Sequence, residues 1–282
     1  MDFKQGRYAM SRKIIRLGLI GKDVSKSESE AIHVFILNEL GYACEYENFS
    51  VDAANFDMAM RRLLGDFDGF NVTIPYKRDV MEYLDGVEGD ALVFGAVNTV
   101  LNDTRVGYNT DGVGFLLTIQ SAGIEVKDKK ILVLGGGGSG RSTAAALKKA
   151  GAEVYVYRRN REELLELCEQ LGVNPIDDPE MGGFDILVNT TGVGMHDTVG
   201  KSPVSAKAFA GAKEAIDLIY YPAQSEFLRL AKGCGLKTLN GEAMLFYQGY
   251  YSDCLYLGLT PNEEQAVELY KKYKGEKKER GL

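Results

Sequence analysis

A glycine-rich turn near the middle of the chain carries the clearest chemistry in the sequence. Gly135, Gly137 and Gly140 satisfy the pattern G-x-G-x-x-G. A continuous apolar run at 131–134 precedes them, and a helical pattern rich in alanine and leucine follows at 142–150. Glycines in this context let the backbone approach a pyrophosphate that lies on the N-terminus of a helix. The segment therefore predicts the strand–turn–helix unit of a dinucleotide-binding fold.

Two other interpretations of this turn stay open. With Gly135, Gly140 and Ser142 the turn nearly matches the phosphate-binding loop of nucleotide triphosphatases, but Arg141 stands where that loop needs a lysine. The turn could also be purely structural.

Arginines at the end of the next predicted strand indicate which dinucleotide is bound. An NAD site usually has an acidic residue at that end to hold the ribose 2′-hydroxyl. Here the strand at 153–157 is followed by Arg158 and Arg159, whereas Glu153 lies at its start. Guanidinium groups bind a 2′-phosphate through charge-assisted hydrogen bonds, so we expect NADP. The alternative is a solvated basic cluster at the start of a helix.

Polar clusters in the first half of the chain predict a binding site for a small molecule. They are Ser-Lys-Ser at 25–27, Asn-Val-Thr-Ile-Pro-Tyr-Lys at 71–77, Asn-Thr at 98–99 and Asn-Thr-Asp-Gly at 109–112. We expect 71–77 to place small polar groups on one face of a strand, with the lysine just past the proline. Together the clusters supply hydroxyls, amides, one ammonium and one carboxylate, which suit a small polyhydroxylated acid. Helix capping would explain 25–27 equally well, and a turn or cap would explain 109–112.

The elements that position these groups follow an α/β rhythm, in which short apolar runs alternate with helical patterns. We expect a strand at 14–21 and then a helix that Gly41 ends. Alternation continues to about residue 120, and a second cycle begins at 131. The sequence therefore predicts two domains with a boundary near residue 112. Residues 1–13 are expected to be a loosely held leader and 273–282 a frayed charged tail. The helices after 242 could belong to either domain.

The motifs, taken in this order, resemble the shikimate dehydrogenase family, which includes shikimate/quinate 5-dehydrogenases. The resemblance runs from about Leu17 to the helix around Gln248. It rests on the segments 25–27, 71–77, 96–99, 109–112, 217–220 and 240–248. It implies an N-terminal α/β substrate domain, residues 1–112, completed by C-terminal helices that return to it, residues 242–282. Residues 113–241 would form a Rossmann-type, doubly wound NADP-binding domain.

The resemblance also implies roles for individual residues. Lys77 and Asp111 would form the catalytic pair, and Ser25 and Ser27 would hold the substrate carboxylate. The other substrate contacts that it implies are Thr73, Asn98, Asp111, Tyr220 and Gln248. The cofactor contacts that it implies are Gly135, Gly136, Gly137, Gly138, Ser139, Arg158 and Arg159, together with Leu218 and, near the nicotinamide, Thr190 and Gly241.

Three positions depart from the family pattern. Glu28 replaces the proline that usually follows Ser-Lys-Ser. Tyr-Arg-Arg at 157–159 replaces the common Asn-Arg-Thr, and Ser-Glu at 225–226 stands where Thr-Pro is usual. The second departure keeps the arginine but bears on the strictness of the NADP preference.

The implied activity is the reversible, NADP-dependent reduction of 3-dehydroshikimate to shikimate, an oxidoreductase step in aromatic amino-acid biosynthesis through chorismate. A ring ketone that accepts hydride develops alkoxide character, which requires a proton and a nearby positive charge. Lys77 would supply both, with Asp111 orienting it. Two alternatives stay open. One is an enzyme that also oxidises quinate with NAD or NADP. The other is a dinucleotide-bound sensor or scaffold without catalysis, whose signature would be loss of Lys77 or Asp111.

Composition narrows the classes of partner. The 282 residues carry 33 basic and 40 acidic side chains, a formal net charge of −7. Nucleic acids and anionic membranes require a basic face, and no apolar run is long enough to cross a membrane, so neither partner is expected. Four scattered cysteines and two histidines predict no disulfide framework and no metal site. His33, expected off the apolar face of its helix, and His196 are given structural or surface roles. We expect a cytoplasmic monomer or homodimer that binds a small-molecule substrate.

Overall fold

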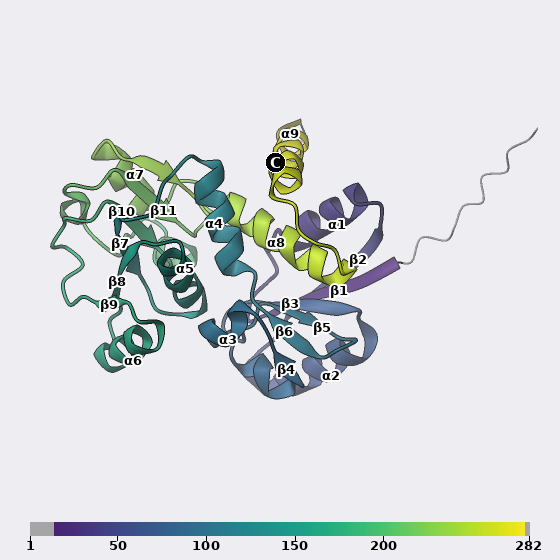
Figure 1. The fold of residues 1–282 in the computed structure, drawn as a ribbon. Helices are drawn as coiled ribbons and strands as arrows, with labels where there is room; N and C mark the ends of the chain where they lie inside the picture. The colour runs from purple at the N-terminus through teal and green to yellow at the C-terminus, as the bar shows by residue number, and fades with distance from the viewer. Residues whose placement is uncertain (1–13, 280–282) are drawn as a thin grey trace, which may run out of the picture.

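Two β-sheets flanked by helices make up the computed structural model, which describes residues 14–279 (Figure 1). The first sheet is mixed. Its strands are β1 (Ile14–Gly21), β2 (Ala43–Ser50), β3 (Gly69–Val72), β4 (Gly86–Val87), β5 (Thr99–Leu101) and β6 (Val106–Tyr108). They lie in the order β2-β1-β3-β5-β6-β4, and β5 runs antiparallel to both of its neighbours. The accompanying helices are α1 (Ser29–Glu39), α2 (Phe56–Asp66) and α3 (Asp90–Phe94), with 3-10 turns at Ala53–Asn55 and Asp79–Tyr83.

The second sheet is parallel throughout and has the doubly wound arrangement. Its strands are β7 (Lys130–Leu134), β8 (Glu153–Tyr157), β9 (Asn174–Pro175), β10 (Ile186–Asn189), β11 (Glu214–Asp217) and β12 (Lys237–Leu239). They lie in the order β12-β11-β10-β7-β8-β9, so the strand order reverses between β7 and β10. Its helices are α5 (Gly138–Lys149), α6 (Arg161–Leu171) and α7 (Glu226–Gly233), with 3-10 turns at His196–Thr198 and Ala206–Phe209.

Alternation along the buried strands explains why helices cover both faces of the second sheet. In β7, Ile131 and Val133 belong to the apolar cluster beneath α5 and α6, whereas Leu132 and Leu134 belong to the cluster that includes α7. Successive side chains of a strand point to opposite faces, so a continuous apolar run requires cover on both sides. The apolar run that the sequence shows is the signature of such a doubly covered strand.

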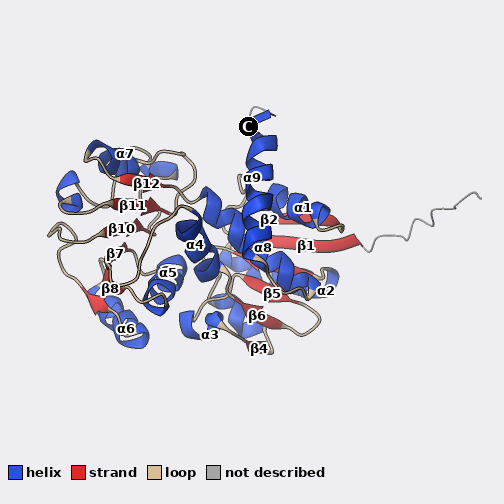
Figure 2. Cartoon of the chain, turned by 45° about the horizontal axis from the view of Figure 1, so that its top comes forward, coloured by secondary structure: helices blue, strands red, loops and turns tan. Residues whose placement is uncertain are grey.

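Three further helices lie between and beside the sheets: α4 (Asp111–Ser121), α8 (Glu242–Leu257) and α9 (Glu263–Glu279). The helix α8 packs against α1 and α4, and α9 packs against α1 and α8 (Figures 1 and 2). The C-terminal helices therefore return to the first sheet, and the predicted fold class is confirmed. Within the described residues, no helix combines the length and hydrophobicity that a membrane crossing needs.

A glycine sets the distance between α4 and α8. A Cβ atom added at Gly114 would lie 2.7 Å from the backbone nitrogen of Gln248, so only glycine permits this approach of the two helices. Asp111 lies one turn before Gly114. The close approach therefore brings the first turn of α4 beside Gln248 in the middle of α8.

Several sequence expectations require correction. The strand predicted over 71–77 ends at Val72, and a turn carries Thr73 to Lys77. The helix predicted over 142–150 begins earlier, at Gly138, inside the glycine-rich turn. The segment 273–282, predicted as a frayed tail, is helical through Glu279 because α9 has a buried aromatic seam. The predicted leader at 1–13 and residues 280–282 lie outside the described residues.

Candidate active site

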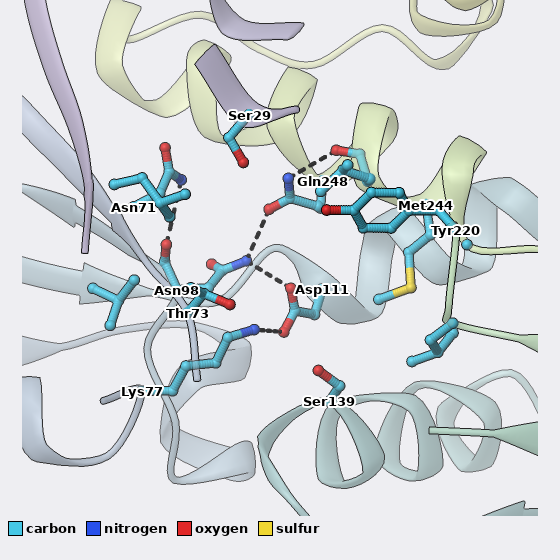
Figure 3. Close-up of a pocket in the computed structure, with 15 residues that line it drawn as sticks. Ser29, Asn71, Thr73, Lys77, Asn98, Asp111, Ser139, Tyr220, Met244 and Gln248 are labelled. Atoms are coloured by element: carbon cyan, nitrogen blue, oxygen red, sulfur yellow. Dashed lines mark hydrogen bonds and ion pairs between the residues drawn. The ribbon is translucent and has the colours of Figure 1, made fainter. Parts of the chain in front are cut away.

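A cavity of about 150 Å³ lies between the two sheets and gathers most of the predicted site residues (Figure 3). Its walls come from both halves of the chain. The predicted residues that line it are Thr73, Lys77, Asn98, Asp111, Ser139, Leu218, Tyr220, Gly241 and Gln248. The other lining residues are Leu19, Ser29, Asn71, Val72, Met244 and Leu245.

Lys77 and Asp111 form a buried ion pair on the cavity wall. The Lys77 Nζ donates a hydrogen bond to Oδ2 of Asp111, and the two residues are 8% and 4% exposed. Lys77 comes from the turn after β3, and Asp111 is the first residue of α4. The second carboxylate oxygen, Oδ1, accepts a hydrogen bond of 2.8 Å from Asn98 Nδ2. Figure 3 shows these three side chains pointing toward one another. The arrangement holds the Lys77 ammonium, which is both a proton donor and a positive charge, in a fixed and largely buried position.

A network of amides fixes the remaining polar groups of the cavity. Asn98 Nδ2 also donates to Gln248 Oε1 at 3.2 Å, and Asn98 Oδ1 accepts from the Thr110 backbone nitrogen at 2.9 Å. Asn71 Nδ2 donates to the Asn98 carbonyl at 3.3 Å. Because each amide is held from both ends, its donors and acceptors face the cavity in a fixed orientation.

Behind Asn71 lies a polar cluster in which His33 and Asp253 are fully buried. Tyr46 donates from its hydroxyl to Asn71 Oδ1 at 3.1 Å, and His33 stacks on the Tyr46 ring with 5.0 Å between centroids. His33 Nδ1 lies 2.6 Å from Asp253 Oδ1, and burial raises the pKa of that carboxyl although His33 opposes the shift. The expectation that His33 lies off the apolar face is therefore wrong, because its carboxylate partner on α8 allows it to be fully buried. His196 lies on the surface.

Three serines follow β1, and the one that lines the cavity is not one that the sequence motif singles out. Ser29, at the start of α1, lines the cavity, whereas Ser25 and Ser27 do not. Ser27 Oγ donates to Ser29 Oγ at 3.0 Å, and Ser25 Oγ donates to Asp23 Oδ1 at 2.7 Å. Neither caps α1, whose N-cap residue is Glu28, although Ser27 Oγ accepts from the Ser29 backbone nitrogen at 3.2 Å.

The glycine-rich turn lies where the order of the second sheet reverses. Gly135 has a φ of +112°, and a Cβ there would lie 2.6 Å from Thr190 Oγ1, so the turn leaves β7 directly beside the end of β10. A Cβ at Gly137 would meet no atom within 4 Å, which leaves that side of the turn open. Ligands of doubly wound sheets bind at this reversal, with phosphates on the N-terminus of the following helix. The turn and the start of α5 thus fit a dinucleotide pyrophosphate.

Arg158 stands at the end of β8 and is held against the glycine-rich turn. Its Nη1 donates to the Gly136 carbonyl at 3.1 Å, and its Nη2 forms an ion pair with Glu163 in the first turn of α6. Arg159 beside it is exposed. The pair of guanidinium groups fits a 2′-phosphate. A bound phosphate would share Arg158 with the carboxylate of Glu163.

Two further predicted cofactor contacts, Leu218 and Gly241, line the cavity where β11 ends. A Cβ at Gly241 would lie 2.0 Å from the Leu218 carbonyl oxygen, so the chain before α8 presses against the end of β11. Asp217 anchors this end. Its carboxylate accepts from Ser225 Oγ at 2.5 Å, and from Asn189 Nδ2 and the Ile219 backbone nitrogen at 3.0 Å. Burial raises the pKa of Asp217 to about 6, with the three hydrogen bonds opposing the shift.

Sequence reasoning missed several lining residues for identifiable reasons. Asn71 and Met244 fall inside recognised motifs but were given no role. Ser29 follows Glu28, outside the Ser-Lys-Ser motif, and only the alternation of serines at 25, 27 and 29 pointed to it. Among residues 14–279, no three His, Cys, Asp or Glu side chains are grouped to hold a metal ion.

Comparison with known proteins places the chain among relatives that cover almost its whole length. A family model described as the shikimate dehydrogenase substrate binding domain matches residues 19–100. Shikimate dehydrogenase (NADP(+)) of Thermus thermophilus is 38% identical over 251 residues, which cover 88% of this chain and 95% of that protein. The protein of the same name from Methanococcus maripaludis is 38% identical over 267 residues, which cover 90% and 95%.

Solved structures give the same result. The Thermus thermophilus shikimate 5-dehydrogenase in complex with NADP(H) and shikimate has a TM-score of 0.83 at 36% identity, covering 92% of this chain and 99% of that one. Quinate dehydrogenase from Corynebacterium glutamicum in complex with NAD has a TM-score of 0.79 at 27% identity, with coverage of 92% and 99%.

A buried lysine–carboxylate pair lies beside the glycine-rich turn of a doubly wound sheet, and with the relatives above it identifies the protein as a dinucleotide-dependent oxidoreductase. The relatives narrow that class, because several are more than 35% identical over nearly their full length. The chain belongs to the shikimate dehydrogenase family.

Proposed function

We propose that this protein is a shikimate dehydrogenase that interconverts 3-dehydroshikimate and shikimate with NADP. The observation that carries the proposal is the contact between the Lys77–Asp111 pair and the glycine-rich turn. A Cβ at Gly138 would lie 3.3 Å from Cδ of Lys77, and Ser139 lines the same cavity as Lys77. Proton donor and dinucleotide site are thereby neighbours, which hydride transfer to a ring ketone requires.

Lys77 is the proton donor in this proposal. NADPH, when bound, supplies a hydride to the ring ketone. Lys77 Nζ donates its proton to the ketone oxygen as negative charge develops there, and its ammonium stabilises that charge. Asp111 holds Nζ in position, and Asn98 in turn holds Asp111 through Oδ1. In the oxidative direction the same lysine, once neutral, accepts the hydroxyl proton.

The remaining cavity residues would bind and orient the substrate. Thr73, Asn98, Asp111, Tyr220 and Gln248 present hydroxyl, amide and carboxylate groups to the hydroxyls of the ring. We assign the carboxylate end to the start of α1, where Ser29 lines the cavity and Ser27 donates to it. Ser25, implied by the family motif, stays a prediction.

The cofactor is assigned to the segments that fit it. Gly135 to Ser139 would receive the pyrophosphate, Arg158 and Arg159 the 2′-phosphate, and Thr190, Leu218 and Gly241 the nicotinamide end. NADP rather than NAD is supported by the two arginines, by the lack of an acidic residue directly after β8, and by the names of the relatives.

We also propose a division into two domains, a substrate domain of residues 1–112 and 242–282 and a cofactor domain of residues 113–241. Each holds one sheet, and the proposed boundary falls in the first turn of α4. We place the enzyme in the cytoplasm, because its four cysteines are free thiols, as is usual in a reducing compartment. We further propose that it is a monomer or homodimer.

One steady-state experiment tests the function. Shikimate and quinate are each assayed with NADP and with NAD, and kcat/KM is measured for the four combinations. We expect shikimate with NADP to give the highest value. A higher value for quinate would identify the protein as a quinate dehydrogenase, and no turnover of either acid would refute the proposal.

A further inference from the structure

A single ammonium group joins the starts of two helices at one end of the cavity. Lys277, near the end of α9, donates to both carboxylate oxygens of Glu28 at 2.7 and 2.9 Å. It also donates to Oε1 of Glu242 at 3.3 Å. Glu28 is the N-cap residue of α1, and Glu242 is the first residue of α8. Figure 2 shows α9 running beside both helices.

The two helix starts carry walls of the cavity. Ser29, next to Glu28, lines it from α1, and Met244 and Gln248 line it from α8. Tyr220 lines the same cavity, and burial raises the pKa of its phenol, with Glu28 adding to that rise and Lys277 opposing it. Both charged groups therefore act electrostatically on a side chain that lines the cavity.

Lys277 and Glu242 keep their charges at neutral pH. Burial alone would lower the pKa of Lys277, but Glu28 and Glu242 outweigh it and the pKa is raised. Burial alone would raise the pKa of Glu242, but Lys274 and Lys277 outweigh it and the pKa is lowered. The Lys277 side chain is only 23% exposed, so solvent screens its interactions incompletely.

Glu28 creates an electrostatic difficulty that Lys277 removes. A carboxylate next to Ser29 repels an anionic substrate whose own carboxylate binds at this serine. Two like charges in a partly buried site disfavour binding. With Lys277 hydrogen-bonded to both of its oxygens, Glu28 is neutralised and held by α9.

Aromatic packing fixes α9 independently of this lysine. Tyr273 contacts the rings of Phe35 and Phe246 at centroid distances of 5.2 and 5.3 Å, and Tyr270 contacts Phe246 and Tyr247 at 5.3 and 5.2 Å. Loss of the Lys277 charge should therefore leave the helix docked.

We propose that Lys277 is a positioning residue that makes the α1 end of the cavity suitable for a substrate carboxylate, by neutralising Glu28 and holding it. This rests on the proposed function. It assigns a role in substrate binding to the C-terminal helix, and it explains how this chain uses glutamate at position 28.

The test compares three variants of the full chain at saturating NADP. Lys277→Met removes the charge and keeps the stem, Lys277→Arg keeps the charge, and Lys272→Met is the matched control. Lys272 lies on the same helix and pairs at 2.5 Å with Glu39, the last residue of α1, at the end away from the cavity. We expect Lys277→Met to raise KM for shikimate about fivefold or more with much less change in kcat. Lys277→Arg and Lys272→Met should stay near the parent value.

The double variant Lys277→Met/Glu28→Gln isolates the charge of Glu28. It should recover most of the KM lost in Lys277→Met, because no uncompensated carboxylate remains beside Ser29. An unchanged KM in Lys277→Met, an equal rise in Lys272→Met, or no recovery in the double variant would each overturn the inference. If the parent turns over shikimate and any of these three results is obtained, the inference is refuted and the proposed function is not. A parent with no shikimate turnover refutes the proposed function, and the inference with it.

Discussion

Lys77 and Asp111 lie 34 residues apart in the chain, yet the ammonium of one donates directly to the carboxylate of the other in the interior. One side chain comes from a turn at the end of a strand and the other from the first residue of a helix. The pair is sandwiched between the first sheet and the start of α5, because Gly138 leaves room for the lysine stem. Its geometry thus depends on both halves of the chain.

Replacing Lys77 with methionine should remove the chemical step and leave most of the substrate binding. We expect kcat to fall by at least about 10²-fold, the lower end of what a positioned acid–base group contributes. KM should change much less, because the ammonium interacts more strongly with the developing alkoxide than with the neutral ketone. The check is kcat and KM at saturating cofactor, with the exposed Lys149→Met as control. A folded Lys77→Met enzyme that keeps more than about a tenth of the parent kcat would contradict the role of Lys77, on the same expectation.

The same variant should lower the melting temperature, because it leaves the Asp111 carboxylate buried without its cation. Breaking a buried pair by removing one partner typically costs about 3–5 kcal/mol. The double variant Lys77→Met/Asp111→Asn removes both charges, so it should recover much of the lost stability and none of the lost kcat. Thermal melts of the three proteins separate the structural contribution of the pair from its catalytic one. Recovery of kcat in the double variant would show that the single variant was inactive only because it was unstable.

Arg158 should read the 2′-phosphate of the cofactor. We expect the parent to prefer NADP over NAD by at least about tenfold in kcat/KM, since one charge-assisted contact contributes roughly 1.5–3 kcal/mol. Arg158→Ala should weaken NADP far more than NAD. Glu163→Gln should lower KM for NADP, because the arginine would no longer be shared with a carboxylate. Equal losses for the two cofactors in Arg158→Ala would mean that this guanidinium does not contact the phosphate.

Alanine variants of the three serines after β1 should differ in their effect on KM for shikimate. Ser29→Ala should raise KM for shikimate most, because its hydroxyl is on the cavity wall. Ser27→Ala should raise KM less, through the hydrogen bond to Ser29, and Ser25→Ala least, because its hydroxyl is bonded to Asp23. Steady-state KM values at saturating NADP rank the three variants. The reverse order would favour Ser25 and Ser27 as the serines that hold the substrate carboxylate, as the Ser-Lys-Ser motif implies, over Ser29, which lines the cavity.

Local signals in the sequence were sufficient for much of the fold. The buried strand before Gly135 and the helix after it are specified by residues within about twenty positions, and both were predicted. Lys77 and Asp111 were singled out because each lies in a motif of several consecutive residues. A local pattern does not show which distant residues a segment packs against. The charged segment of α9 is polar on its own, and it becomes an ordered helix only because Phe35 and Phe246 cover Tyr273.

Ser29 and His33 show the same limit within the site. Whether Ser25, Ser27 or Ser29 faces the substrate depends on where α1 begins, and helix starts are set by one or two residues. His33 was expected off the apolar face of its helix, and an imidazole is costly to bury without a partner. Its partner Asp253 lies 220 residues further along the chain, and no spacing rule connects the two.

The buried carboxyl of Asp217 should make the stability of the protein depend on pH in a defined window. Its pKa is raised from 3.8 to about 6 in the folded state, chiefly by burial. Between these values the folded protein holds a proton that the unfolded chain has released. The stabilisation is therefore fully present below about pH 4 and is lost as pH rises through about 6. A shift of this size corresponds to roughly 3 kcal/mol, at about 1.4 kcal/mol per pKa unit.

Asp217→Asn isolates this contribution because it removes the charge and keeps the same three hydrogen-bond partners. The amide oxygen still accepts from Asn189 and the Ile219 nitrogen, and the amide nitrogen donates to Ser225 Oγ. Other carboxyls titrate in both proteins, so the informative quantity is the difference in unfolding free energy between variant and parent. We expect this difference to increase in favour of the variant from pH 4 to pH 7, by up to the roughly 3 kcal/mol above. Urea unfolding at four pH values measures it, with Asp177→Asn as the surface control, since that side chain is 73% exposed. A difference for Asp217→Asn that stays constant over this range would show that the Asp217 carboxyl ionises in the fold as readily as in the unfolded chain.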